Sequence, residues 1–232
     1  MTTGDAAPVL LLHGWAGSFR ETWRSTGVDA LLGDSGRTVV GLDLLGHGSS
    51  PAPHEPEAYS DMSGWLLQSI ADQPRPIDAA GFSLGALTLL GALVREPERF
   101  GRVLLSGIGD GVFEERDPAE NSRIVDALEG RAADTDTGAL VFARYADAPG
   151  KDKAALTAIM KRPPSPPLDP SVLGRIANPV RVVIGDNDFA APADRLAAAF
   201  PNGDLVVLRN TDHFATPESF SFIDAMLDFF GA

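Results

Sequence analysis

The sequence contains no cysteine among its 232 residues. Disulfides, thiolate nucleophiles and thiolate metal sites are therefore excluded, although the absence is compatible with either redox compartment. Histidine is also scarce, and its four residues are scattered, so no cluster with metal-ligand spacing is present. We expect no metal and no other cofactor.

Basic residues are few: 19 Lys and Arg stand against 32 Asp and Glu, which gives a formal net charge of −13. Such a surface repels phosphates and argues against nucleic-acid or anionic-membrane partners. No apolar run has the length of a membrane span, and residues 1–5 lack the basic start of a signal peptide. We expect a soluble cytoplasmic protein, and the acidic composition does not define its substrate.

Apolar runs alternate with helix-like stretches along most of the chain, whose length suits one domain over residues 1–232. The runs read as buried strands. They lie at 8–12, 38–43, 79–82, 102–106, 180–185 and 205–208. The alternation predicts an α/β fold with a mostly parallel central sheet and helices on both faces.

The alternation pauses between about residues 111 and 170. Three weakly amphipathic stretches lie there, around 124–128, 140–145 and 156–160, and a proline-dense exit follows at 163–167. We interpret this segment as a small helical lid inserted into the domain. The residues predicted to contact the apolar part of a substrate are Phe113, Phe142, Tyr145 and Met160.

The segment Gly81-Phe82-Ser83-Leu84-Gly85 joins a predicted strand to a predicted apolar helix. A serine on so tight a turn takes strained backbone angles, and small neighbours let the strand and helix close on each other. The turn holds the hydroxyl at the carboxyl end of the sheet, where the helix directs its first N–H groups. Ser83 is therefore the candidate nucleophile.

A serine hydroxyl needs a base to accept its proton, and histidine suits that task near neutral pH. His213 follows the last predicted strand and so lies at the same sheet edge as Ser83. His13 and His47 stand in glycine turns that favour structural hydrogen bonds, and His54 lies in a proline-rich loop, where we expect it to be solvated. The spacing favours His213 as the base.

An acid must orient the imidazole and stabilise its protonated form. Asp186 and Asp188 both follow the strand predicted at 180–185, and Asp110 follows the strand before it. From the residues alone, all three carboxylates are candidates.

Five short segments occur in the order that is typical of the α/β-hydrolase superfamily, which the chain resembles from Pro8 to its end. They are His13-Gly14-Trp15, Asp43-Leu44-Leu45-Gly46-His47-Gly48-Ser49-Ser50, Gly81-Phe82-Ser83-Leu84-Gly85, Gly185-Asp186-Asn187-Asp188 and Asp212-His213. The resemblance implies a Ser83, Asp188 and His213 triad, because the family's G-x-x-D spacing favours Asp188. It also implies an oxyanion hole formed by the backbone N–H groups of Trp15 and Leu84.

Two departures from the family pattern shape the expectation. Only seven residues precede Pro8, where the family usually has a β-hairpin, so we expect a sheet short by a strand or two at that edge. A serine at position 83 argues against the dehalogenase and epoxide-hydrolase branches, where the resemblance implies aspartate.

The resemblance implies a serine hydrolase that cleaves a carboxylic ester or thioester through an acyl-enzyme. The small predicted lid, with its modest aromatic content, suits a small to medium acyl group. Two alternatives stay open. One is C–C bond hydrolysis, lyase chemistry or cofactor-free perhydrolysis on the same triad, since fold does not decide chemistry. The other is a non-catalytic protein on this fold that binds a small ligand.

Overall fold

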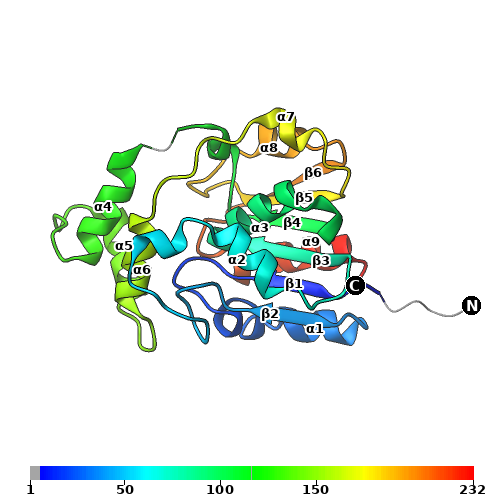
Figure 1. The fold of residues 1–232 in the computed structure, drawn as a ribbon, viewed down its shortest axis with the longest axis horizontal. Coiled ribbons are helices and arrows are strands. Elements are labelled where there is room, and N and C mark those ends of the chain that lie inside the picture. Colours follow the sequence, from blue (N-terminus) through cyan, green and yellow to red (C-terminus); the bar gives the residue numbers. More distant parts are fainter. Residues whose placement is uncertain (1–5, 116) are drawn as a thin grey trace, which may run out of the picture.

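A six-stranded sheet forms the centre of the molecule in the computed structural model, which describes residues 6–115 and 117–232 (Figure 1). Its order is β2-β1-β3-β4-β5-β6, and the five strand pairings are all parallel. The strands are β1 (Val9–Leu12), β2 (Val39–Leu42), β3 (Ile77–Phe82), β4 (Phe100–Ser106), β5 (Val180–Gly185) and β6 (Gly203–Leu208). Each lies at a predicted position, and the predicted α/β fold class is confirmed.

In the described part of the chain, β2 and β6 form the two edges of the sheet. No strand precedes β1 among residues 6–8. The expectations about residues 1–5 lie outside the described residues.

Helices cover both faces of the sheet. On one face lie α1 (Val28–Asp34) and α9 (Phe220–Phe230), whose apolar residues join a cluster with Val9, Leu11 and Leu104. On the other face lie α2 (Met62–Ser69), α3 (Leu84–Arg95) and α8 (Asp194–Ala198), packed against Leu10, Leu12 and Leu105. Neighbouring strand residues thus point to opposite faces, and both faces are buried.

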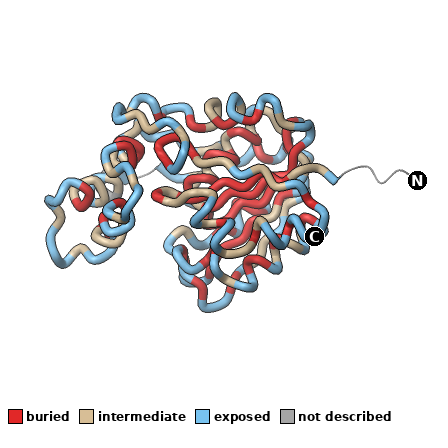
Figure 2. Tube along the Cα trace, turned by 90° about the horizontal axis from the view of Figure 1, so that it is seen from below, coloured by how far each residue is buried: buried red, intermediate tan, exposed pale blue. Residues whose placement is uncertain are grey.

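The core follows from this double cover. β1 and β3 are buried along their whole length, as expected for central strands of a parallel sheet. Figure 2 shows the buried stretches gathered in the sheet, with exposed segments around it. The strands therefore form a firm base for the loops that follow their carboxyl ends.

The 111–170 segment connects β4 to β5 and lies beyond the carboxyl ends of the strands (Figure 1). It holds α4 (Pro118–Leu128), α5 (Thr137–Ala146) and α6 (Lys153–Lys161), which include the three predicted stretches, and α7 (Pro170–Leu173) follows it. An aspartate side chain accepts a backbone N–H hydrogen bond at the start of each of these helices.

One prediction about the last helix is wrong. In the sequence, the spacing of Phe220, Ile223, Leu227 and Phe230 puts them near one face of a helix and predicts a shared buried stripe. The side chain of Phe220 is instead 85% exposed. The buried stripe contains Phe222, Met226 and Phe230 beside Ile223. Phe220 lies about a quarter-turn outside the centre of that stripe, at the solvent-facing start of the helix.

Within residues 6–115 and 117–232, no helix has both the length and the apolar character that crossing a membrane requires.

Candidate active site

The turn between β3 and α3 carries Ser83 with a strained backbone. β3 ends at Phe82 and α3 begins at Leu84, so Ser83 alone makes the connection, with φ 52° and ψ −113°. Few non-glycine residues adopt a positive φ, and such strain concentrates at functional sites. The Ser83 N–H donates to the Ser106 carbonyl at 2.8 Å, which ties the turn to the end of β4.

The two glycines around Ser83 are required by close packing. A Cβ atom at Gly81 would lie 2.7 Å from the backbone nitrogen of Ala86, and one at Gly85 would lie 2.5 Å from the His13 carbonyl oxygen. In both cases the contacting atoms belong to the backbone, which cannot rotate away as a flexible side chain can. The glycines at positions 81 and 85 therefore allow α3 to start directly against β1 and β3.

Ser83, His213 and Asp188 form one hydrogen-bonded chain at the carboxyl edge of the sheet. The Ser83 Oγ lies 3.0 Å from His213 Nε2. On the other side of the ring, His213 Nδ1 lies 2.9 Å from both carboxylate oxygens of Asp188. Asp188 and His213 are buried, whereas Ser83 is partly exposed.

The partners of His213 determine which ring nitrogen carries the proton. An ionised carboxylate only accepts hydrogen bonds, so Nδ1 of His213 donates to Asp188. The lone pair on Nε2 is then free to accept the Ser83 hydroxyl proton. The arrangement can therefore take a proton from Ser83 while a carboxylate stabilises the resulting imidazolium.

The other candidate acids lie elsewhere. Asp186 is exposed, and one of its oxygens accepts the Thr211 N–H at 3.3 Å. Asp110 accepts the N–H of Leu196 at 2.9 Å, near the start of α8. Among the three carboxylates, Asp188 is the one that is hydrogen-bonded to His213.

The two residues whose backbone N–H groups are expected to face an oxyanion, Leu84 and Trp15, both lie near Ser83. Leu84 is the first residue of α3, so its N–H has no acceptor within the helix. Trp15 follows β1 in the loop 13–17 and lines the same cavity as Ser83. The Trp15 indole N–H donates to the Leu156 carbonyl of α6 at 3.2 Å, which links this loop to the 111–170 segment.

Two buried histidines join the loop 13–17 to the turn 43–50. His13 Nε2 accepts the Leu44 N–H at 3.0 Å, and His47 Nε2 accepts the Ala16 N–H at 3.0 Å. The Nδ1 atoms then donate to the carbonyls of Gly14 and Leu45, at 2.7 and 3.0 Å. This reciprocal pair, which we call the histidine cross-tie, matches the structural role expected for both residues.

Burial keeps the cross-tie uncharged. It lowers the pKa of His13 to about 4. Burial, and then the nearby His13, lower the pKa of His47 to about 3. His54, by contrast, is exposed as expected, and its hydrogen bond to Asp152 raises its pKa.

A cavity of about 350 Å³ adjoins Ser83 and His213. Of the four residues predicted to contact a substrate, Phe142 and Tyr145 line it. Phe113 and Met160 do not: the Phe113 ring lies under the Arg195 guanidinium, and Met160 lines a separate hollow on the 111–170 segment. Both side chains are partly buried and pack against the larger hydrophobic core cluster instead.

Sequence reasoning missed several residues beside the site, among them Phe189, Phe214 and Lys151. Phe189 packs on the His213 ring with centroids 4.2 Å apart, and Phe214 lies 5.6 Å from the same ring. Lys151 lines the cavity and forms an ion pair with Glu21. The sequence could have indicated the two phenylalanines, because each directly follows a predicted triad residue: Phe189 follows Asp188, and Phe214 follows His213.

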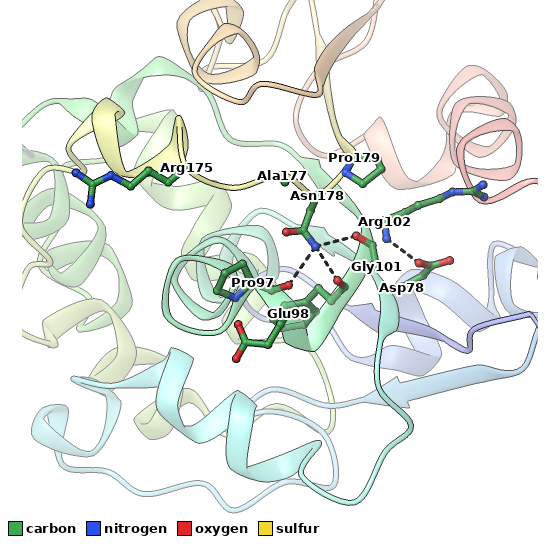
Figure 3. A pocket seen from close by; sticks show the side chains of 10 residues that line it. Asp78, Pro97, Glu98, Gly101, Arg102, Arg175, Ala177, Asn178 and Pro179 are labelled. Atoms are coloured by element: carbon green, nitrogen blue, oxygen red, sulfur yellow. Dashed lines mark hydrogen bonds between the residues drawn. The ribbon is translucent and has the colours of Figure 1, made fainter.

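A second, more open hollow of about 590 Å³ lies near the starts of β4 and β5, away from Ser83 (Figure 3). Its polar groups tie strand starts together. The Asn178 side-chain amide donates to the carbonyls of Pro97, Phe100 and Gly101, and Asp78 accepts the Arg102 N–H at 2.7 Å. None of its ten lining residues is a serine or histidine, so it offers no counterpart to Ser83 and His213.

The parallel sheet, the strained serine turn and the loops at the strand ends together define an α/β protein with a hydrolase-like site. A model of the alpha/beta hydrolase family matches residues 9–221. The chain belongs to this family, and its membership supports a hydrolase.

Known proteins give a consistent picture of the fold. A 2-hydroxy-6-oxononadienedioate/2-hydroxy-6-oxononatrienedioate hydrolase of Escherichia coli K12 is 33% identical over 107 residues, which are 44% of this chain and 36% of that protein. The match thus covers little more than a third of the relative's length. The enol-lactonase of Burkholderia xenovorans LB400 has a TM-score of 0.74 at 21% identity, covering 100% of this chain and 94% of its own. An Exiguobacterium antarcticum esterase has a TM-score of 0.75 at 19% identity, covering 99% and 93%.

Proposed function

We propose that this protein is a serine hydrolase that cleaves a carboxylic ester or thioester of a small to medium acyl group. The observation that carries the proposal is the hydrogen-bonded chain from Ser83 through His213 to Asp188, at the wall of a cavity. A strained serine next to a buried imidazole and carboxylate is the arrangement that nucleophilic catalysis needs.

In the first half of the proposed reaction, the Ser83 Oγ attacks the carbonyl carbon while its proton passes to His213 Nε2. Asp188 stabilises the imidazolium through the Nδ1 hydrogen bonds. The tetrahedral intermediate then collapses, the bond from carbon to the alcohol oxygen or thiol sulfur breaks, and His213 gives the proton to the leaving group. An acyl group remains on Ser83.

In the second half, water takes the place of the leaving group. It attacks the acyl carbon, gives its proton to His213 Nε2, and forms a second tetrahedral intermediate. Collapse of this intermediate releases the carboxylic acid and returns the proton to Ser83. No other reactant is consumed, so the reaction balances as hydrolysis of one ester or thioester bond by one water.

The negative oxygen of both intermediates needs hydrogen-bond donors. We assign the backbone N–H groups of Leu84 and Trp15 to this role, because Leu84 begins α3 directly after Ser83 and Trp15 lines the same cavity from the loop 13–17. One oxyanion donor contributes a factor of about 10² to 10³ in kcat. The helix dipole of α3 adds favourable charge at the same position.

The position of the 111–170 segment beyond the strand ends suits a lid. Phe142 and Tyr145 come from its helix α5 and line the cavity. The cavity volume of about 350 Å³ lies near the lower end of the range for small-molecule sites, which favours a compact substrate.

A second candidate reaction is hydrolysis of a C–C bond next to a carbonyl. The similarity of 107 residues to the E. coli hydrolase named above favours it. The same three side chains would serve, since their geometry does not distinguish the two leaving groups. Assays with a vinylogous 1,5-diketone beside simple esters separate the two reactions.

The test of ester hydrolysis is turnover of p-nitrophenyl butyrate by three purified proteins. Wild type should hydrolyse the ester, and Ser83→Ala should lose activity by a factor on the order of 10³ or more. Ser35→Ala is the matched control and should keep wild-type activity. Ser35 lies between the end of α1 and the start of β2, whereas Ser83 follows the carboxyl end of β3. A folded wild-type protein that hydrolyses neither esters nor diketones would contradict the proposal and favour a ligand-binding protein.

A further inference from the structure

The cavity beside Ser83 has two chemically different parts. One is made of aromatic rings, contributed by Trp15, Phe142, Tyr145 and Phe214. The other is polar and comes mainly from the π-helical turn η1 (Arg20–Arg24) and the residues after it, with Glu21, Thr22 and Thr26. A substrate in this cavity therefore meets two unlike surfaces.

The aromatic rings form a continuous cluster although they come from three separate segments. Trp15 lies 5.6 Å from Phe142, and Phe142 lies 6.0 Å from Phe214, measured between ring centroids. Tyr145 stacks on Phe214 at 5.2 Å, with their planes 11° apart. Phe142 and Tyr145 are three residues apart on α5, so they project from one side of that helix. We call these four rings the aromatic wall.

The aromatic wall is incompletely covered. Tyr145 is 46% exposed and Phe214 is 38% exposed, and Phe189, which packs on His213, is 66% exposed. These three are half of the exposed large apolar side chains among the described residues. Exposed apolar surface that gathers around a cavity marks a binding site, because a ligand that covers it releases water.

His213 determines which part of a substrate meets the aromatic wall. Its Nε2 faces Ser83, and in the proposed reaction this atom protonates the leaving group. The leaving group must therefore lie on the His213 side of the reacting carbon. Phe214 adjoins His213 and connects it to the other rings, which places the aromatic wall on the alcohol side of the ester.

We infer that the preferred substrates are esters with an aryl group in the alcohol portion, held against the aromatic wall. The inference rests on the proposed function, because it needs His213 as the proton donor to the leaving group. Rings in offset or edge contact attract each other beyond the effect of area alone. A benzyl group should therefore bind better than a saturated ring of similar size.

The test compares two matched pairs of esters. The first pair, benzyl acetate and cyclohexylmethyl acetate, varies the ring in the alcohol portion. The second pair, methyl phenylacetate and methyl cyclohexylacetate, varies it in the acyl portion. We expect kcat/KM to be about three- to tenfold higher for the benzyl ester in the first pair. In the second pair we expect a ratio near one.

Variants separate recognition by the aromatic wall from the intrinsic reactivity of the esters. Tyr145→Leu and Phe214→Leu should reduce the ratio within the first pair toward one, because each removes a ring from the wall. Phe113→Leu is the matched control, since Phe113 does not line the cavity, and it should keep the wild-type ratio. Intrinsic reactivity is the same for every variant, so a change in ratio reports recognition.

Each outcome decides a different claim. Ser83-dependent hydrolysis with no benzyl preference, with a preference in the acyl pair alone, or with a ratio that Tyr145→Leu and Phe214→Leu leave unchanged would overturn this inference and leave the proposed function in place. A folded protein that hydrolyses neither any of the four esters nor p-nitrophenyl butyrate would overturn the proposed function together with the inference.

Discussion

At the scale of single residues, the two aspartates after β5 differ in what they contact. Asp188 is buried and holds both carboxylate oxygens at 2.9 Å from His213 Nδ1. Asp186 is exposed and accepts a long hydrogen bond from the Thr211 N–H, at 3.3 Å. Two positions of sequence therefore separate a carboxylate that can orient the imidazole from one that cannot.

This difference predicts opposite results for two conservative substitutions. Asp188→Asn removes the charge that stabilises the imidazolium and should lower kcat by a factor on the order of 10³ to 10⁴. Asp186→Asn should stay within about twofold of wild type. Steady-state hydrolysis of p-nitrophenyl butyrate, with circular dichroism to verify folding, measures both. Loss of activity in Asp186→Asn, with wild-type activity in Asp188→Asn, would contradict this assignment and identify Asp186 as the acid.

His13 and His47 are not among the residues that line the cavity, but the histidine cross-tie that they form holds the loop 13–17, which does line it. The Ala16 N–H that His47 accepts belongs to the residue after Trp15, and Ala16 is buried with a φ of 59°. A buried N–H that loses its acceptor destabilises a protein by about 1–3 kcal/mol. The loop 13–17 would relax to satisfy it, and the Trp15 N–H would move with the loop.

His47→Leu should therefore lower kcat by about 10- to 100-fold with little change in KM, because oxyanion stabilisation matters in the transition state. His47→Gln should recover much of the loss, since its amide oxygen can take the place of Nε2 as an acceptor. The kcat and KM of the two variants are the readout. A Leu variant with wild-type kcat would show that the cross-tie does not position the oxyanion donor.

At the scale of elements, the tight join between β1, β3 and α3 depends on missing side chains. A Cβ atom at Gly85 would meet two backbone oxygens, at 2.5 Å from His13 and 2.6 Å from Leu12. Backbone of a central strand has no freedom to move. Relief of the clash would require α3 to shift away from the sheet.

Gly85→Ala should therefore destabilise the protein by about 2–3 kcal/mol, as overpacking of a close contact does. Gly33→Ala is the matched control. Gly33 lies in α1, and a Cβ atom there would meet nothing within 4 Å. Alanine at that position should increase stability by about 0.5–1 kcal/mol. Urea unfolding measures both, and a Gly85→Ala variant as stable as wild type would contradict the packing argument.

Sequence reasoning worked best for the elements whose environment is uniform. Central strands such as β1 and β3 are buried on both faces, so an unbroken apolar run predicts them. It also predicted the edge at which Ser83 and His213 meet, because both follow parallel strands. It could not choose between Asp186 and Asp188 without the family pattern, since both follow β5 and only packing separates them.

The 111–170 segment was harder to predict for a physical reason. Spacing shows which residues of a helix share a face, but it does not show which neighbouring element that face packs against. Phe142 and Tyr145 line the cavity, whereas Met160 points into a different hollow. The start of α9 was misjudged similarly, because Phe220 fits an apolar stripe by spacing but lies where no neighbour covers it.

At the scale of the whole molecule, the two buried histidines link stability to pH. The folded-state pKa values of His13 and His47, about 4 and about 3, lie below the ordinary value of 6.5. Between these values the unfolded chain binds more protons than the folded one. Their contribution is therefore complete above pH 6.5 and is lost as the pH falls below it.

Stability should fall by up to about 1.4 kcal/mol per pH unit for each of these histidines below pH 6. His47→Gln should flatten the dependence between pH 6 and 4.5, relative to wild type measured in the same series. His54→Gln is the control, because His54 is exposed, and it should keep the wild-type slope in that window. Urea midpoints at several pH values test this, and identical slopes for wild type and His47→Gln would contradict it.

The proposed chemistry requires that Ser83 is an activated nucleophile. Incubation with a fluorophosphonate, followed by peptide mass spectrometry, locates the residue that attacks phosphorus. We expect one adduct, on Ser83, that is absent in Ser83→Ala and forms far more slowly in His213→Ala. An adduct on another residue, or no adduct on the folded wild-type protein, would contradict the central claim.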